Sequence, residues 1–117
     1  MATIQIKRAY EPKEKSDGLR ILVDRLWPRG IKKENLHVDV WLKEIAPSTE
    51  LRKWFNHDVK KWNPFHEKYN AELKHSTAAE EIIKLVKTHK TVTLIYSAKD
   101  EQHNQAIVLK EFLQKHH

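Results

Sequence analysis

The stretch Leu19-Arg-Ile-Leu-Val-Asp-Arg-Leu-Trp-Pro-Arg-Gly-Ile31 begins as an apolar run and ends among charged residues. Its first part, rich in aliphatic and β-branched side chains, is typical of a buried strand. Pro28 and Gly30 then interrupt the regular backbone. We therefore expect a strand over residues 19–25 whose carboxyl end leads into a turn with charged side chains.

Two further segments are predicted as strands. Residues 91–96, Thr-Val-Thr-Leu-Ile-Tyr, form an apolar, β-branched run, and residues 3–7 alternate with Ile4 and Ile6 on one side. The polar segment over residues 10–18 is predicted as a loop. A loop of this length permits a hairpin between the first two strands and also permits other arrangements.

Residues 36–45 fit two structures. Apolar residues alternate from Leu36 to Leu42, as in a strand, whereas Asp39 could cap a short helix over residues 40–45. The helix is preferred here because three of its apolar side chains would then share one face.

Four longer segments are predicted as helices from their caps and apolar stripes. Ser48 is a natural N-cap for residues 49–55, and Asn63 with Pro64 would open the next helix. That helix places three apolar residues at i, i+4 and i+8, namely Phe65, Tyr69 and Leu73.

Two more helices follow towards the end of the chain. Thr77 and Glu80 have the spacing of a capping box for a helix that runs to about His89. Asp100 or a neighbour would cap the last helix, which turns Ala106, Leu109 and Leu113 inward. Strands near both ends with helices between them predict a single α/β domain over residues 1–117, with a small, mostly parallel sheet of three or four strands.

The chain has 117 residues and no cysteine, and its length suits one domain. The lack of cysteine excludes disulfides, thiol catalysis and cysteine-ligated metals, and it predicts a cytoplasmic location. We expect no membrane segment, since no apolar run approaches roughly 20 residues, and no signal peptide follows Met1. His116 and His117 could be native or the start of a purification tag, so both are set aside.

Lysine and arginine number 22 against 16 acidic residues, a formal net charge of +6. This balance favours anionic partners such as phosphates, acidic metabolites or nucleic acid. The basic residues are interleaved with acidic ones along the chain, as on the solvated surface of an ordinary basic protein. Both interpretations remain open.

The first candidate site lies at the end of the strand over residues 19–25. Arg25 and Arg29 present planar, permanently charged donor forks that suit a carboxylate or phosphate. Asp24 could orient one arginine or act as a base. The alternative is an internal Asp–Arg pair that only fixes the turn.

The second candidate site is the segment Tyr96-Ser-Ala-Lys-Asp-Glu-Gln-His-Asn104, which joins a strand to a helix. Free backbone N–H groups at a helix start favour anions. Lys99 would add charge, and His103 could move a proton near neutral pH. The segment has no glycine, so it is no phosphate-binding glycine loop, and an ordinary capped helix is the alternative.

The two sites would merge if the strands over residues 19–25 and 91–96 were parallel neighbours, since ligands of such sheets lie beyond the carboxyl ends. This hypothesis predicts ligand binding by Arg25, Arg29, Lys99, His103 and Asn104. Catalytic candidates are His103 with Asp24 or Asp100 as its orienting carboxylate.

Other residue groups give weaker signals. Most of the four tryptophans are expected in packing, and the rest could wall a pocket or stack on bases. The histidines lack the spacing of a metal site, so we expect neither a metal nor another cofactor. Ser97 beside His103 could be a nucleophile, but the spacing alone is weak support.

Four blocks resemble the bacterial domain of unknown function 488 family, in its subgroup of short YeaO-like proteins. The blocks are Leu22-Val-Asp-Arg-Leu-Trp-Pro-Arg-Gly-Ile31, Trp41-Leu-Lys-Glu-Ile-Ala-Pro-Ser48, Glu50-Leu-Arg-Lys-Trp-Phe-Asn-His-Asp58, and Thr93-Leu-Ile-Tyr-Ser-Ala-Lys-Asp100 with His103-Asn104. The resemblance implies a small cytoplasmic α/β protein and brings no established activity.

The resemblance also implies a difference within the family. Many members of the wider family carry Cys-His-Arg at the start of the last helix, where this chain has Gln102, His103 and Asn104. The histidine is kept, but the cysteine and the arginine are replaced, so neither thiol chemistry nor an arginine-anchored anion site is expected at these positions.

The function predicted from these observations is a pocket for a small anionic ligand, either a phosphate or a carboxylate, with catalysis left open. The alternative is a nucleic-acid-associated or regulatory module that uses net charge and exposed aromatic side chains. A third possibility is a protein-interaction domain that docks through a tryptophan-rich surface.

Overall fold

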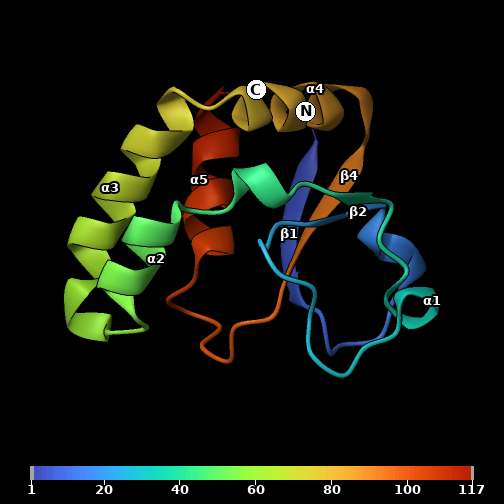
Figure 1. Ribbon diagram of the computed structural model, residues 1–117. Helices are drawn as coiled ribbons and strands as arrows, with labels where there is room; N and C mark the ends of the chain where they lie inside the picture. Colours follow the sequence, from blue (N-terminus) through green and yellow to red (C-terminus); the bar gives the residue numbers. More distant parts are fainter. Residues whose placement is uncertain (1, 117) are drawn as a thin grey trace.

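A computed structural model describes residues 2–116 of the chain. Its centre is one sheet of four strands in the order β1-β4-β2-β3, and every neighbouring pair is parallel (Figure 1). The predicted α/β class with a small parallel sheet is therefore confirmed. The strands are β1 (Thr3–Arg8), β2 (Leu19–Leu22), β3 (Val40–Trp41) and β4 (Thr91–Tyr96).

Most of the helices lie on one side of the sheet. Figure 1 shows α2, α3 and α5 on one side of the strands and the short α1 on the other. None of the helices in the described range is long and apolar enough to cross a membrane. The helices are α1 (Lys33–Leu36), α2 (Thr49–Phe55), α3 (Trp62–Lys74), α4 (Thr77–Thr88) and α5 (Gln105–His116), with 3-10 turns η1 (Lys15–Asp17), η2 (Lys43–Ile45) and η3 (Val59–Lys61).

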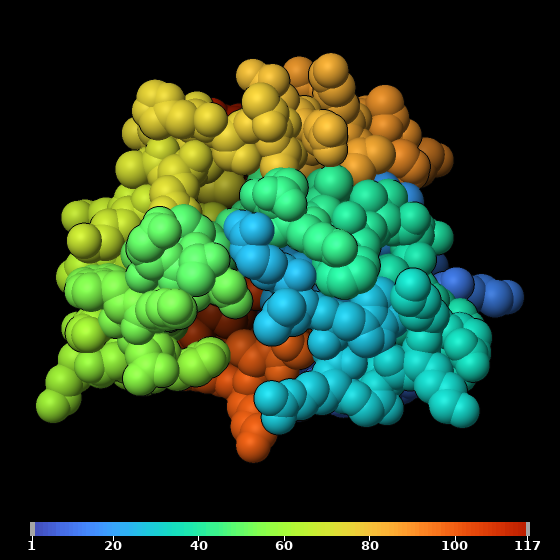
Figure 2. Space-filling model, in the orientation of Figure 1, coloured from blue at the N-terminus to red at the C-terminus, as the bar shows by residue number. Residues whose placement is uncertain are grey.

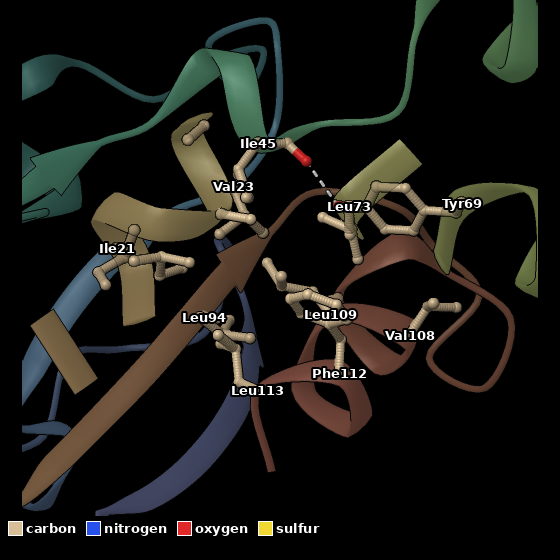
Figure 3. Close-up of a cluster of buried hydrophobic side chains, with 14 of the residues drawn as sticks. Ile21, Val23, Ile45, Tyr69, Leu73, Leu94, Val108, Leu109, Phe112 and Leu113 are labelled. Atoms are coloured by element: carbon tan, nitrogen blue, oxygen red, sulfur yellow. Dashed lines mark hydrogen bonds between the residues drawn. The ribbon is translucent and has the colours of Figure 1, made fainter. Parts of the chain in front are cut away.

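The core divides along the two faces of the sheet because successive strand side chains point to opposite faces. Ile21 and Leu94 belong to the large cluster beneath the helices, whereas Leu22 and Ile95 belong to a smaller cluster with Leu36 of α1. Figure 3 shows the large cluster, in which strand residues meet side chains from α3 and α5. The predicted inward stripes of α3 and α5 are buried in it, namely Phe65, Tyr69, Leu73, Ala106, Leu109 and Leu113.

The hairpin between the first two strands does not form. β4 lies between β1 and β2 and pairs with both, with Ile21 opposite Leu94 and Leu22 opposite Ile95. The carboxyl ends of β2 and β4 therefore meet at the same edge of the sheet, which is the arrangement that the merged site required.

The predicted helix over residues 40–45 is wrong. Val40–Trp41 is a strand paired with β2, and only Lys43–Ile45 turns, as a 3-10 helix. The edge of β2 offers backbone partners that a helix could not use: Asp39 N donates to Arg20 O at 2.8 Å, and Leu42 N donates to Leu22 O at 3.0 Å. The Asp39 carboxylate accepts from the Arg20 amide instead of capping a helix.

The helix caps are partly as predicted. Ser48 caps α2, its hydroxyl accepting from Leu51 N at 3.2 Å. α3 begins at Trp62, so Asn63 lies inside its first turn rather than at the N-cap. Ser76, not Thr77, caps α4, because its hydroxyl accepts from Ala79 N.

A buried ionic cluster lies on the face of the sheet that carries the smaller hydrophobic cluster. Arg20 and Asp17 are only 1% and 2% exposed and form an ion pair, and Lys7 Nζ lies 2.9 Å from the second Asp17 oxygen. The remaining Arg20 donors reach the carbonyls of His37 and Leu36. Every charge in the cluster therefore has a partner, as burial demands.

Candidate functional site

Asp24 joins the ends of the two central strands. It lies two residues after the end of β2, and one carboxylate oxygen accepts from Ser97 N at 2.8 Å and from Ser97 Oγ at 2.7 Å. The other oxygen accepts from Gln105 Nε2 at the start of α5. With 9% of its surface exposed, this carboxylate ties β2, the segment after β4 and α5 together.

The surroundings of Asp24 favour its protonated form. Burial raises the pKa of Asp24, while the hydrogen bonds from Ser97 and Gln105 and the positive charge of Arg52 lower it. Burial is the stronger influence, so the pKa of Asp24 lies above its usual value. A buried carboxyl with this tendency is typical of functional sites, although structural aspartates also show it.

Arg52 is the residue that the sequence analysis missed. It comes from α2, and its charge acts on Asp24, yet it forms no ion pair within residues 2–116. Its Nε atom is buried without a hydrogen-bond partner. Helical periodicity placed Leu51 and Phe55 in the core, but nothing in the pattern could show that the charge of Arg52 would act on Asp24.

The surface is hollowed between the segments that carry these residues. Figure 2 shows a hollow between α2, in green, and the segment after β2, in blue. The segment after β4 and the beginning of α5, in orange to red, form its floor. Helix α2, the segment after β2 and the segment after β4 thus border one depression at the carboxyl edge of the sheet.

Arg25 and Arg29 lie on the same segment but have different surroundings. Arg25 forms a loose ion pair with Glu44, with 3.8 Å between Nη1 and Oε2, and its Nε is buried without a partner. It lines a pocket of about 160 Å³ that also contains Glu44 and Glu72. Arg29 is exposed, and its carbonyl oxygen accepts a hydrogen bond from the Tyr10 hydroxyl at 3.0 Å.

His103 is oriented by Asp100. Its Nδ1 lies 3.0 Å from Asp100 Oδ2, its backbone N–H donates to Asp100 Oδ1, and its ring meets Trp62 edge-on at 5.2 Å. The backbone N–H of Gln102, followed by His103, lowers the pKa of Asp100. Of the two carboxylates considered for His103, the structure pairs it with Asp100.

Ser97 and His103 belong to different pairs. The Ser97 hydroxyl donates to Asp24, and His103 pairs with Asp100. A serine nucleophile needs its hydroxyl bonded to a base that is oriented in turn by a third group. Among the described residues, a hydroxyl, an imidazole and an orienting carboxylate are present, but no hydrogen bond joins Ser97 to His103.

Asn104 and Lys99 complete the predicted set. Asn104 is buried, donating from Nδ2 to Asp100 O at 2.9 Å and accepting from Ile107 N through Oδ1. It therefore holds the start of α5. Lys99 is exposed, and in the described part of the chain no hydrogen bond or ion pair joins Lys99 or His103 to either Arg25 or Arg29.

The tryptophans are mostly engaged in packing. Trp27 and Trp41 meet edge to face at 5.3 Å, and Trp62 stacks on Phe65. Trp54 is 36% exposed, but Lys61 Nζ and Lys68 Nζ lie over its ring, 5.1 and 4.6 Å from the ring centroid. Among residues 2–116, no three histidines, aspartates or glutamates gather as a metal site would require.

The sequence comparisons place the chain in a family. A model described as the inactive DUF488-N3 subclade matches residues 3–117. The chain belongs to this subclade. The resemblance seen in its sequence blocks is thereby confirmed.

Its relatives are themselves uncharacterised. The chain is 52% identical over 111 residues to the uncharacterised protein YeaO of Escherichia coli K12, covering 94% of this chain and 96% of that protein. It is 37% identical over 110 residues to uncharacterised proteins of Mycobacterium bovis and Mycobacterium tuberculosis, covering 94% of this chain and 92% of each relative. No solved structure matches the chain significantly.

Proposed function

We propose that this protein binds a small carboxylate or phosphate in the hollow between α2 and the segment after β2 and does not transform it chemically. The observation that carries the proposal is Arg52, whose charge acts on the buried Asp24 carboxyl. Arg52 forms no ion pair within the described residues, and its Nε is buried without a partner. A buried polar donor left unpaired costs roughly 1–3 kcal/mol, and an anionic ligand at this place would recover that free energy.

The wider charge distribution supports an anion. The chain carries a formal charge of +6, which raises the local concentration of anions at its surface. Arg25, Arg29 and Lys99 remain candidate contributors on the segments that border the hollow. An arginine fork binds planar carboxylates and phosphates in two places at once, so Arg52 is proposed as the anchor and the other three as support.

Three observations support the absence of catalysis. The Asp24–Ser97 and Asp100–His103 pairs each hold the segment after β4, and no hydrogen bond among the described residues joins the two pairs. The description of the subclade as inactive agrees with this, as does the presence of Gln102 and Asn104 beside His103 in place of the cysteine and arginine that the family resemblance implied.

A binding screen tests the proposal. Wild type, Arg52→Gln and Lys53→Gln are compared by thermal shift and calorimetry against phosphate, sulfate, acetate and citrate. Lys53 is an exposed neighbour on α2, so its variant removes the same charge without removing the anchor. A ligand at 100 times its Kd stabilises the folded state by about 2.7 kcal/mol. We expect this shift in wild type and Lys53→Gln and its loss in Arg52→Gln; equal binding by all three proteins would overturn the proposal.

Nucleic-acid binding has less support. It would use exposed aromatic rings as stacking platforms, but lysines already occupy the ring of Trp54. A short oligonucleotide in the same screen separates the two functions, because nucleic-acid binding weakens steeply with salt. Salt-sensitive oligonucleotide binding without any small-anion binding would favour this alternative.

A further inference from the structure

We propose that the pocket lined by Arg25 and Glu72 binds a small zwitterion, that is, an amino acid with a small side chain. The pocket has a volume of about 160 Å³, and its lining comes from the segment after β2, the η2 turn and its neighbour Ala46, Ser48, α3 and Ser76. None of its lining residues belongs to α2 or to the segment after β4. It is therefore a different place from the hollow, and the inference does not depend on the proposed function.

Glu72 supplies a fixed negative charge to this pocket. Its Oε1 accepts from Ser48 N at 2.9 Å, and its Oε2 accepts from Ser48 Oγ at 2.6 Å. Both donors belong to an uncharged residue, and Glu72 forms no ion pair within residues 2–116. Each carboxylate oxygen can accept a further hydrogen bond, so the oriented carboxylate can still receive a cation such as an ammonium group.

Arg25 supplies a positive charge that is only weakly engaged. Its Nη1 lies 3.8 Å from Glu44 Oε2, which is too long for a hydrogen bond, and the two side chains are 30% and 78% exposed. Ion pairs of this exposed kind contribute little to stability. A ligand carboxylate could therefore replace Glu44 at the guanidinium at small cost.

The two charges line one pocket without neutralising each other. No ion pair joins Arg25 to Glu72 within the described range. A ligand with a single charge would be attracted by one of these groups and repelled by the other. An amino acid carries both charges, so its carboxylate suits the arginine fork and its ammonium suits Glu72. Ser76 also lines the pocket, and its hydroxyl accepts from Ala79 N, which leaves the hydroxyl proton for a ligand oxygen.

The size and the apolar part of the pocket limit the ligand. Ile45, Tyr69 and Leu73 form its apolar lining, and Figure 3 shows these three side chains near one another. The volume of about 160 Å³ equals that of roughly five water molecules in the liquid and is well below the roughly 300 Å³ at which pockets for drug-sized ligands begin. The ligand is therefore an amino acid of about the size of alanine, rather than a nucleotide or an aromatic amino acid.

Four small molecules test the need for both charges. L-alanine and β-alanine carry the two charges at different spacings, whereas propionate lacks the ammonium and ethylamine lacks the carboxylate. Their Kd values are measured by calorimetry at neutral pH and constant ionic strength. We expect at least one amino acid to bind and both analogues to bind at least about tenfold more weakly. Binding of neither amino acid, or equal binding of one of the analogues, would overturn the proposal.

Variants that remove one charge locate the ligand. Arg25→Gln and Glu72→Gln should each weaken amino acid binding at least about tenfold. Lys53→Gln and Glu67→Gln remove the same charges at exposed positions and should keep the wild-type Kd. Loss of binding in Glu44→Gln instead of Glu72→Gln would overturn the role of Glu72.

The wild type gives a test that needs no folded variant. The backbone N–H of Ser48 donates to Glu72, so its ¹⁵N amide signal should shift saturably with the calorimetric Kd of the amino acid. An unchanged Ser48 signal at saturation would overturn the site.

Arg52→Gln separates this inference from the proposed function. Amino acid binding should persist in Arg52→Gln, whereas sulfate binding should be lost. Loss of amino acid binding in this variant would place the ligand in the hollow and overturn the pocket. Sulfate binding that needs Arg52, together with no amino acid binding to wild type, overturns the pocket and leaves the proposed function standing.

Discussion

Asp17 and Asp24 are both buried, but their partners differ in charge. Asp17 lies between Arg20 and Lys7, whereas Asp24 takes its hydrogen bonds from Ser97 and Gln105. Burial would raise the pKa of Asp17, but hydrogen bonds from Glu14 N, Lys7 and Arg20 outweigh it and hold that pKa below its usual value. The pKa of Asp24 is shifted upward.

These opposite shifts predict opposite pH dependences of stability. Asp17 stabilises the fold above its unfolded pKa, and this contribution is lost as the pH falls through its lower folded pKa. Asp24 stabilises the fold below its unfolded pKa, and this contribution is lost as the pH rises through its higher folded pKa. On acidification, the stability of Asp17→Asn relative to wild type should therefore rise and that of Asp24→Asn should fall.

Urea unfolding at a series of pH values measures both slopes, each at most about 1.4 kcal/mol per pH unit. Parallel slopes for the two variants would contradict the assignment of different environments to the two carboxyls.

Arg20 is the residue whose loss should damage the fold most directly. Arg20→Ala would leave Asp17 buried with Lys7 as its remaining close cation. Breaking a buried ion pair from one side costs roughly 3–5 kcal/mol. Urea unfolding should show this loss, while Lys13→Ala, at an exposed position, should stay within about 0.5 kcal/mol of wild type. A loss below about 1 kcal/mol for Arg20→Ala would show that the cluster is not energetically important.

At the scale of elements, Ser48 connects two helices. Its hydroxyl caps α2, and Glu72 of α3 accepts from both its backbone N–H at 2.9 Å and its hydroxyl at 2.6 Å. Ser48→Ala removes a cap worth about 1 kcal/mol and a hydrogen bond to a charged group worth roughly 1.5–3 kcal/mol. Ser76→Ala removes the comparable cap of α4 alone and should cost only about 1 kcal/mol. Equal losses in unfolding experiments would contradict the link to Glu72.

The elements that could be predicted are those with a signal in their own residues. The strand over residues 91–96, the helix after Ser48 and the apolar stripe of α3 depend on local pattern, and all of them appear in the structure. Val40–Trp41 could not be assigned in this way, because its strand exists only through pairing with the edge of β2. Tertiary context decides such short, ambiguous segments.

The same distinction applies at the scale of the whole molecule. Parallel pairing of β2 with β4 was a hypothesis from the sequence, and it brings Asp24 to Ser97. Arg52 belonged to no motif that the sequence analysis singled out for chemistry, because its influence on Asp24 follows from how α2 packs in the tertiary structure. The sequence therefore predicted that the ends of β2 and β4 would meet, but it did not predict the part of Arg52, and the candidate site itself stays a prediction.

The central claim is that a small anion binds at Arg52, and an NMR titration of the ¹⁵N-labelled protein with sulfate tests it most directly. Arg52 Nε–H and the Ser97 amide report on the hollow, and the Lys61 amide reports on the region around Trp54 as an internal control. We predict saturable shifts at Arg52 and Ser97 that share one Kd, with little change at Lys61. Shifts that do not saturate, or that occur around Lys61 without Arg52, would contradict the account.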